Sequence, residues 1–579
     1  MTTLLLTTLL LPLAGAVLAL GNGARARHSA LMTTLVTLVL AAILVAQFPG
    51  GTDVFAKMDL GWLGAADGSK DSIGICFRIG LDGLSVWLFG LTALLMVVAV
   101  LVSWEAIDQR PAAFYGLLLA LETGMLGVFV ARDIILFYVF FEFTLIPLFF
   151  LIGIWGSEER RYAAIKFFLF TLAGSVLTLL GLLAIVLWDY YHSPTGVMTF
   201  SIADLTSGLA ARPMERWMQV GVFGLLFAGF AIKVPLFPLH TWLPLAHVQA
   251  PTAGSVILAG VLLKIGTYGF VRFALPMTPE GVAACMPWLL WLSLIGILYG
   301  ALVALGQDDV KRLIAYSSVS HLGFCMLGVF ALNPLGLQGG VLQMVNHGLS
   351  TGGLFAIVGM LYERYHTRRI EDLGGLARQT PLLAAFMVIF SLSSIGLPGL
   401  NGFVGEFLIL VGMFQRGWAE APAALAAQYR AIAVLAVAGV VLGAWYMLGL
   451  VEKVFFGPLR VPGQGAGRHG AAHGTAHEGA VRDLVPREVL ALSLLVVFIV
   501  WIGVQPRLFL DPMAPTLEGL SRRATESVAL AHGPAAQVPR LNGDRSFPEG
   551  HAAPSHAAQG RAARVPRLNG SASFVYSEN

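Results

Sequence analysis

Long apolar segments separated by short polar connections dominate the hydrophobic pattern of this chain. A helix needs about 20 apolar residues to cross the roughly 30 Å hydrocarbon core of a bilayer, and fourteen segments approach or exceed that length. They centre on residues 2–20, 30–48, 84–103, 112–131, 134–155, 164–188, 218–239, 250–274, 286–305, 314–331, 340–362, 382–414, 430–451 and 488–510. The pattern therefore predicts an all-α polytopic membrane protein with about 14 transmembrane helices.

Composition supports a membrane protein. Hydrophobic residues make up 57% of the 579 positions and charged residues only 12%, whereas soluble domains carry about 25% charged residues. The first apolar run, Thr2 to Leu20, lacks a basic leader and is followed at once by another span, so we interpret it as a transmembrane helix. The net charge of +3 comes from basic residues scattered over loops, which is typical of membrane topology and not of nucleic-acid binding.

The distribution of Lys and Arg among the loops predicts the orientation. If the N-terminus lies outside the membrane, most of the Lys and Arg residues fall in inner loops, as the positive-inside rule requires. We expect a multi-pass protein of the bacterial inner membrane with both termini on the periplasmic side.

Two spans are interrupted by helix-breaking residues. The seventh contains AIKVPLFPLHTWLP and the twelfth contains SLSSIGLPGLNGFVGEF. Matching breaks in two halves indicate inverted repeats, with the unwound segments at the transport path. The predicted organisation is 1–110, helices 1–3; 111–275, a first five-helix repeat of helices 4–8 with helix 7 broken; 286–452, the inverted repeat of helices 9–13 with helix 12 broken; 453–487, a cytoplasmic Gly/Ala/His-rich loop; 488–510, helix 14; and 511–579, a disordered tail.

The loop at 453–487 and the tail have low-complexity composition. The histidines of the loop could bind a metal, but their irregular spacing favours a flexible linker. The tail is rich in Ala, Pro, Gly and Ser and repeats VPRLNG, which predicts disorder.

Ionisable side chains inside the apolar spans are the strongest functional signal. A lysine at the bilayer centre costs about 2.5–3.5 kcal/mol, so function is the default hypothesis for such residues. The embedded groups and those at the first break are Glu122, Glu142, Lys166, Lys233, His240, His247, Lys264, His321, His347 and Glu406. All are acids, bases or imidazoles able to hold or pass a proton, which favours a proton path.

Glu142 and Lys233 are the best candidate pair for a proton switch. Pro235 and Pro238 make the helix at Lys233 breakable, so the pair could form and separate. The alternative is a fixed ion pair that holds two spans together. Lys264 could relay protons to the second half, although a lysine that extends to the membrane surface is an alternative.

The remaining candidates have structural alternatives too. His321 and His347 have small polar neighbours that leave room for water, but each could be a satisfied core histidine. His240 and His247 could instead hydrogen-bond the broken helix. Glu406 follows the second break and could be the terminal proton acceptor, or it could only bind unwound backbone. Glu122 could pair with Lys166, with Arg132 or with nothing, and Lys166 is otherwise a relay candidate.

The cysteines argue against redox chemistry in this chain. Cys76, Cys285 and Cys325 lie far apart without the spacing of a disulfide framework or an iron–sulfur site. No cofactor site and no metal site are predicted here.

Several ordered motifs resemble the proton-conducting antiporter-type subunits of respiratory complex I. They are FYVFFEFTLIPLFFLIG at 137–153, the block AIKVPLFPLHTWLPLAHVQAPTAGSVILAGVLLKIGTYG, DDVKRLIAYSSVSHLGF at 308–324, NHGLSTGGLF at 346–355 and GLPGLNGFVGEF at 396–407. The resemblance covers about residues 60–510.

This resemblance implies a role for each matched residue. Glu142, Lys233, Lys264, His321, His347 and Glu406 would line a pair of proton half-channels. Sister subunits carry a lysine where this chain has Glu406. Partners would be other membrane subunits of complex I, with antiporter-like subunits L and N on either side, while FMN, iron–sulfur clusters and quinone would belong to partner subunits. The long tail departs from the family pattern.

Two other functions remain open. One is a subunit of a Mrp-type cation/proton antiporter or of a membrane-bound hydrogenase, which use the same module. The other is a scaffold that conducts no protons and only binds partners.

Overall fold

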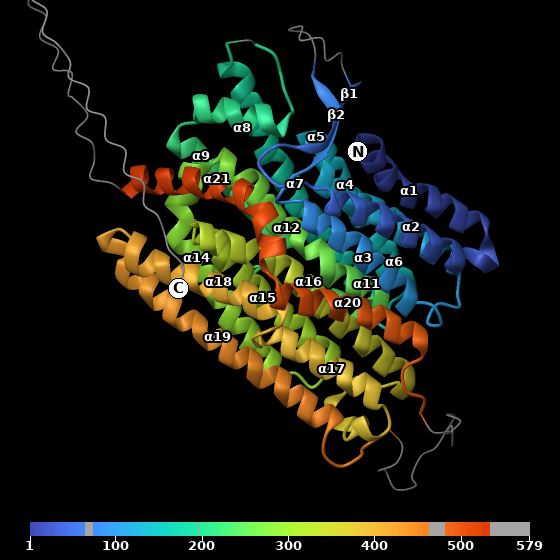
Figure 1. Cartoon of the computed structure of the whole chain (residues 1–579). Helices are drawn as coiled ribbons and strands as arrows, with labels where there is room; N and C mark the ends of the chain where they lie inside the picture. Colours follow the sequence, from blue (N-terminus) through green and yellow to red (C-terminus); the bar gives the residue numbers. More distant parts are fainter. Residues whose placement is uncertain (64–72, 195, 463–480, 533–579) are drawn as a thin grey trace, which may run out of the picture. The chain divides into compact units, whose positions relative to one another are not determined.

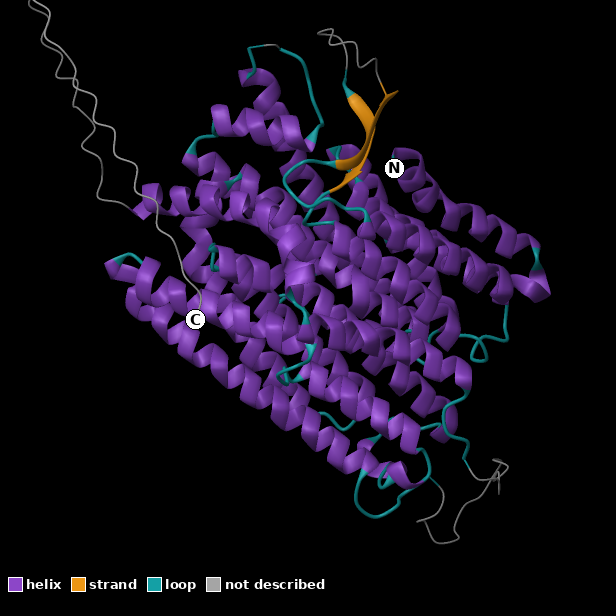
Figure 2. Ribbon diagram, viewed as in Figure 1, coloured by secondary structure: helices purple, strands orange, loops and turns teal. Residues whose placement is uncertain are grey.

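The computed structural model describes residues 1–63, 73–194, 196–462 and 481–532. These residues form a bundle of long helices with a small two-stranded sheet at one end (Figure 1, Figure 2). Among them are eleven helices long and apolar enough to cross a membrane. The predicted polytopic helical fold is thus confirmed, whereas the count of fourteen spans and the inverted relation of the repeats stay predictions.

The elements follow the apolar segments of the sequence. The first part contains α1 (Thr2–Gly21), η1 (Gly23–Arg25), α2 (Ala26–Ala46), β1 (Phe55–Leu63), β2 (Ile75–Leu81), α3 (Val86–Val102), α4 (Pro111–Val130), α5 (Ile134–Phe143), α6 (Leu145–Trp155), α7 (Arg160–His192), α8 (Ile202–Ala211) and α9 (Arg216–Lys233). The middle part contains α10 (Trp242–Gln249), α11 (Thr252–Ile257), the π-turn η2 (Leu258–Leu262), α12 (Leu263–Gly269), the π-turn η3 (Phe270–Ala274), α13 (Leu275–Met277), α14 (Pro279–Leu305), α15 (Val310–Phe330) and α16 (Pro334–Tyr365). The last part contains the 3₁₀ turns η4 (Ile370–Asp372) and η5 (Leu376–Arg378), then α17 (Pro381–Ser394), α18 (Asn401–Gln415), the π-turn η6 (Arg416–Glu420), α19 (Ala423–Phe455), α20 (Pro486–Val504) and α21 (Arg507–His532).

Side-chain caps fix the start of helices that carry candidate residues. The Asp133 carboxylate accepts from the backbone N–H of Ile135 at 3.0 Å and so caps α5. Asp309 caps α15, and Asn333 caps α16 directly before Pro334. A cap satisfies N–H groups that have no partner within the helix, so each helix begins at a defined residue.

Both helix interruptions expected from the sequence are present. Helix α9 ends at Lys233 because Pro235 and Pro238 cannot donate the backbone hydrogen bonds that would extend it. Helix α17 ends at Ser394, and Gly396 then adopts a φ of 73°, a conformation that favours glycine. The breaks therefore lie directly beside Lys233 and the helix that carries Glu406.

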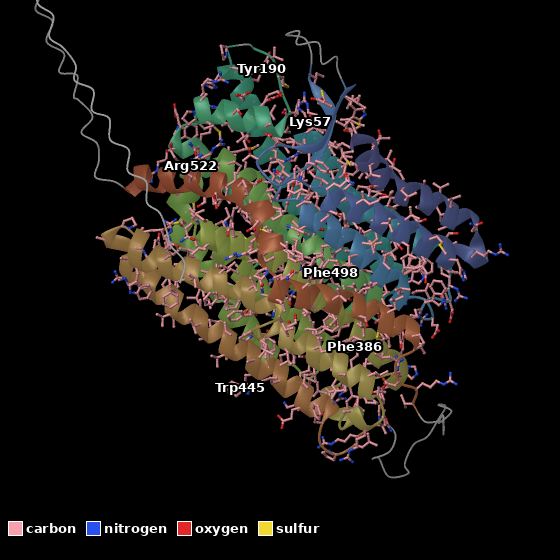
Figure 3. All side chains as sticks on the ribbon, viewed as in Figure 1. Lys57, Tyr190, Phe386, Trp445, Phe498 and Arg522 are labelled. Carbon is pink, nitrogen blue, oxygen red and sulfur yellow. The ribbon has the colours of Figure 1, made fainter. Side chains whose placement is uncertain are left out.

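The centre of the bundle consists of the continuous helical segment Thr252–Met277 together with α15 and α16. In the most apolar stretches of Thr252–Met277 and of α16, 100% of the residues are buried. The corresponding share for α19, at the edge of the bundle, is 39%. Helix α19 instead presents large apolar side chains outward, such as Trp445 (Figure 3), which is 63% exposed. Such a surface suits contact with lipid, whereas Lys264, His321 and His347 lie on the buried helices.

The predicted disordered tail is wrong over its first part. Helix α21 continues to His532 and buries Met513 and Leu517 completely. Its Thr516 hydroxyl donates to the carbonyl of Gly51, and its Ser521 hydroxyl donates to that of Leu332. Residues 533–579 lie outside the described residues, as do residues 463–480 of the predicted cytoplasmic loop.

The sheet was not expected in an all-α protein. Strands β1 and β2 pair antiparallel, with Met58 opposite Ile79. The segment after β2 touches α21, since a Cβ at Gly83 would lie 2.9 Å from the Cα of Met513. We call the end of the bundle that carries β1, β2 and α21 the sheet face.

The buried positions of α21 predict that this helix stabilises the sheet face. Replacing Leu517 by Ala should lower the stability of the folded chain by about 2–5 kcal/mol, because a fully buried leucine is lost. Thermal unfolding of the purified protein in detergent measures the effect. Glu518→Ala, at the neighbouring exposed position, is the control and should change stability little. An equal effect of the two substitutions would contradict the docking of α21.

Candidate functional site

Lys264 lies in the completely buried part of the bundle. It is the second residue of α12, directly after the π-turn η2, and its side chain has no exposed surface. Its ammonium donates to the carbonyl of Ala259 and lies 2.6 Å from Nδ1 of His347 on α16. π-Turns widen a helix and are frequent at functional sites. Lys264 and His347 are 83 residues apart in the sequence, and the fold brings their side chains into contact.

His321 and Glu406 form a second direct contact. Nδ1 of His321, on α15, lies 3.1 Å from Oε1 of Glu406 on α18. The same carboxylate oxygen accepts from the side-chain amide of Gln343 at 3.1 Å. On its other side, the His321 ring nitrogen Nε2 lies 3.1 Å from the hydroxyl of Ser394 at the end of α17. Glu406 is therefore bound to side chains, and its predicted alternative role as a ligand of unwound backbone alone is not what the structure shows.

A short gap separates the two histidines. The ring centroids of His321 and His347 are 5.6 Å apart. A polar cavity of about 10 Å³ lies between α15, α16 and the break after α17, lined by both rings and by Asn346, Ser350 and Thr351 among others. Nε2 of His347, Oδ1 of Asn346 and Oγ1 of Thr351 have no hydrogen-bond partner among the described residues. The cavity has room for about one water molecule with several polar partners, which is the arrangement that a proton step between the rings needs.

One face of α16 supplies most of this polar surface. Gln343, Asn346, His347, Ser350 and Thr351 are spaced at i, i+3, i+4, i+7 and i+8, so they share one side of the helix, and all are buried. The side chain of Asn346 donates to the carbonyl of Asn401 at the start of α18. This hydrogen bond connects the start of α18, which follows the second helix break, to the polar face of α16 in the centre of the bundle. Gln343 and Asn346 were not among the predicted site residues. Their helical spacing with His347, as polar residues within an apolar span, could have identified them from the sequence.

The predicted contact between Lys233 and Glu142 is not found. Lys233 is 6% exposed at the end of α9, and its ammonium lies 4.6 Å from the ring centroid of Phe141. Glu142 is half-buried at the end of α5, and the ion pairs of the described residues do not join it to Lys233. The aromatic ring is the group in direct contact with the ammonium and stabilises it through its π-electrons. The Glu142 carboxylate still acts electrostatically on the ammonium from a greater distance, so the pairing of the two residues, as a switch or as a fixed ion pair, stays a prediction.

Comparison with known proteins finds relatives of nearly the whole membrane portion. Residues 131–428 match the family model described as NADH:quinone oxidoreductase/Mrp antiporter, TM. A protein of Rhodobacter capsulatus named NADH-quinone oxidoreductase subunit M is 40% identical over 524 residues, which covers 88% of this chain and 94% of that protein. The chain belongs to the NADH:quinone oxidoreductase/Mrp antiporter family. The resemblance inferred from the motifs is confirmed.

Solved structures agree with membership of the NADH:quinone oxidoreductase/Mrp antiporter family. A chain of respiratory complex I from Thermus thermophilus with bound NADH is 35% identical, with a TM-score of 0.76 over 90% of this chain and 99% of that chain. A chain of the Mrp complex from Dietzia sp. DQ12-45-1b has a TM-score of 0.75 over 92% of this chain and 99% of that chain, at 22% identity. The second likeness shows a shared fold alone.

Two further histidines of this family member lie among aromatic rings. His247 has no exposed surface, stacks on Phe355 with ring centroids 4.5 Å apart, and leaves both ring nitrogens without a partner in the described part of the chain. His240 lies 5.1 Å from the ring of Tyr299, and its Nδ1 is unpartnered in the same way. Neither imidazole hydrogen-bonds the broken helix through these nitrogens, so the two remain relay candidates by position only.

Glu122 and Lys166 do not meet. Glu122 is completely buried on α4, and neither of its carboxylate oxygens has a hydrogen-bond partner among the described residues. Lys166 is half-buried on α7, with its ammonium 6.0 Å from the ring of Phe170. Arg132 is occupied elsewhere. Of the three possibilities left open for Glu122, an isolated carboxyl group is the one observed.

A buried ion-pair cluster at the sheet face was not predicted. The Asp82 carboxylate accepts from Arg272 at 2.6 and 2.7 Å and from Arg132 at 2.9 Å. Burial alone would raise the pKa of the Asp82 carboxyl, but the two guanidinium groups outweigh burial and hold that pKa far below its usual range. Arg272 lies on η3, two turns beyond Lys264. The cluster ties the segment after β2 to the helix that carries the central lysine.

Metal ligands do not gather at this site. The described ranges contain no group of three or more His, Cys, Asp or Glu side chains placed to hold a metal ion. The site is instead a line of acids, bases and polar amides on four helices.

Proposed function

We propose that this chain is a proton-translocating membrane subunit of NADH:quinone oxidoreductase, of the subunit M type. The observation that carries the proposal is the line of close contacts from Lys264 through His347 and His321 to Glu406. Every member is a proton donor or acceptor, and the line joins the centre of the bundle to the second helix break. A scaffold that only binds partners does not need such a line of buried titratable groups.

The geometry supports three proton steps. Protonated Lys264 donates to Nδ1 of His347, which is 2.6 Å away. The proton then passes across the small cavity to His321 through one water molecule. His321 finally donates to the Glu406 carboxylate at 3.1 Å. Each transfer lies within hydrogen-bond reach or spans one water, as general acid–base transfer requires.

The first half of the bundle would load Lys264. Lys233 lies at the first break, and its ammonium contacts an aromatic ring, with the Glu142 carboxylate near enough to act on it electrostatically but not in an ion pair. A lysine without a fixed counter-ion is free to change partner when the break moves, so Lys233 and Glu142 remain the proposed switch in the loading half. Glu122, Lys166, His240 and His247 are additional relay candidates, supported by their positions on the surrounding helices.

Assembly and location follow from the family relation and from topology. We infer that other membrane subunits of the complex flank the chain, with antiporter-like subunits L and N as neighbours. FMN, iron–sulfur clusters and quinone would lie in partner subunits, so quinone reduction there would drive the protons here. The Thr2 hydroxyl donates to the carbonyl of Lys57 on β1, so the N-terminus lies at the sheet face. We infer that this face is periplasmic in a bacterial inner membrane and that both termini lie on that side.

The alternative of a Mrp-type antiporter or membrane-bound hydrogenase subunit has weaker support. Its likeness is at the level of fold, at 22% identity for the Mrp chain, against 40% for the subunit M relative. Sodium-dependent proton exchange by vesicles lacking NADH would favour the alternative.

Replacing His347 by Phe should test the proposed line of transfer. The ring keeps its volume but loses both nitrogens, so proton translocation should fall by about 10²-fold, the lower end of what a positioned proton-transfer group contributes. The measurement is NADH-driven acidification of vesicles that contain the assembled complex, together with the rate of quinone reduction. His192→Phe, at the exposed end of α7, is the matched control and should behave as the wild type. Full proton translocation in the His347 variant would overturn the proposed function.

A further inference from the structure

The helix that carries Glu406 continues into a π-turn with a buried arginine. Helix α18 ends at Gln415 and passes directly into η6, whose first residue is Arg416. Ten residues separate Glu406 from Arg416, a rise of about 15 Å toward the sheet face. Arg416 is 1% exposed, which is unusual for an arginine that lacks a tight counter-ion.

The contacts of Arg416 leave its charge only partly compensated. Its Nε donates to the carbonyl of Ala331 at 2.6 Å and lies 3.5 Å from Oε2 of Glu420. That carboxylate oxygen is shared, because the side-chain amide of Asn333 donates to it at 3.3 Å. Nη2 of Arg416 has no hydrogen-bond partner in the described residues, and neither has the hydroxyl of the buried Tyr429. The guanidinium is therefore held in place by one carbonyl and one distant carboxylate.

The helix interface between Glu406 and Arg416 is closely packed and apolar. A Cβ at Gly339 of α16 would lie 2.7 Å from the backbone nitrogen of Ile409, and a Cβ at Gly412 would lie 2.4 Å from that of Gly336. Ile409 and Met413 have no exposed surface. Packing at such distances leaves no room for water between the two helices, and the next charged residue along the chain after Glu406 is Arg416.

We infer that Arg416 is an electrostatic barrier on the sheet-face side of Glu406 that opposes the return of protons, and that Glu420 sets its height. An arginine keeps its charge at every physiological pH, and fixed positive groups of this kind exclude protons from narrow membrane pores. A proton that passes in either direction when the interface opens meets a guanidinium half-compensated by Glu420. The charge therefore slows the return of protons from the sheet face, and its partial compensation keeps release from Glu406 possible. The inference rests on the proposed function, since it assigns Glu406 to the releasing end of the path.

Passive proton flux tests this barrier separately from pumping. The assembled complex is placed in vesicles without NADH, a pH gradient is imposed, and proton entry is followed with a pH-sensitive dye. Arg416→Gln removes the charge and should raise passive flux through the complex by about tenfold, the effect of one unit charge at about 10 Å in a medium of intermediate dielectric. Arg416→Lys keeps the charge and should leak no more than the wild type.

The control separates charge from local packing. Arg430→Gln removes an exposed arginine that donates to the carbonyl of Gly417 on the same π-turn, and it should not raise the passive flux. The inference would be overturned if the Arg416→Gln and Arg416→Lys variants had equal passive proton flux. It would also be overturned if the passive flux of the Arg416→Gln variant did not exceed that of the wild type.

A second variant keeps the test informative if the Arg416→Gln complex does not assemble. Glu420→Gln removes the compensating charge, so passive flux should not rise and NADH-driven proton release should slow. Faster release or a higher leak in this variant would overturn the inference. Substitution of Glu406 tests the proposed function independently. If that substitution stops proton pumping while the Arg416→Gln variant shows no increased passive flux, the barrier is refuted and the proposed function stands.

Discussion

Replacing Glu406 by Gln is expected to abolish proton translocation through this subunit, with a loss of about 10³-fold or more. Gln preserves the shape of the side chain and can still bind the Gln343 amide and His321, but it cannot accept and release a proton. The line from Lys264 would then end at His321. The measurement is the number of protons moved per NADH oxidised by vesicles that contain the assembled complex.

The control for Glu406→Gln is Glu452→Gln. Glu452 is exposed on α19, so the same chemical change there should leave the proton yield unaltered. Unchanged assembly of both variants, followed by native electrophoresis, assigns the loss to proton chemistry. A Glu406→Gln variant that moves protons normally would show that His321 passes its proton to another group.

Replacing Lys264 by Met is the second change with a large expected effect. Met fills most of the volume of the lysine without a charge, so α12 should remain packed while His347 loses its only proton donor among the contacts described. Proton translocation should fall by about 10²–10⁴-fold. Quinone reduction should slow as well, because the redox reaction is coupled to proton movement in the proposed function.

Lys453→Met is the matched control for this prediction. Lys453 is exposed near the end of α19, and its loss should change neither rate. Restoration of proton movement by Lys264→Arg would argue against the assigned role, because an arginine does not release its proton at physiological pH.

The sequence predicted the fold well where hydrophobicity and backbone chemistry decide it. The lengths of the apolar segments predicted the positions of the long buried helices. Pro235 and Gly396 mark the two helix breaks that the structure contains. It failed at α21, where Pro512 and Pro515 lie inside the helix and hide the spacing of the buried Met513 and Leu517. A proline in the interior of a helix removes a backbone hydrogen bond, so the sequence argued against the helix that tertiary packing nevertheless stabilises.

The candidate site was predicted in its members but not in its contacts. Lys264, His321, His347 and Glu406 were selected because charge is costly inside an apolar span, and the fold brings them together. A direct ion pair of Lys233 with Glu142 is not formed, because sequence spacing identifies a helix but not its rotation, and the Phe141 ring lies closest to the ammonium. The Asp82 cluster escaped notice because its carboxylate lies in a connection, where a single acidic residue is ordinary.

The polar face of α16 has a mechanical consequence. His347 contacts the central lysine and Gln343 contacts Glu406, and the two residues are one turn apart on a helix of 32 residues. A continuous α-helix moves approximately as a stiff rod, so a movement of α16 itself displaces both side chains together. An axial slide or rotation of α16 therefore changes the distance between Lys264 and His347 and the hydrogen bond from Gln343 to Glu406 at the same time, so proton transfer at the lysine is coupled to the environment of the final carboxylate.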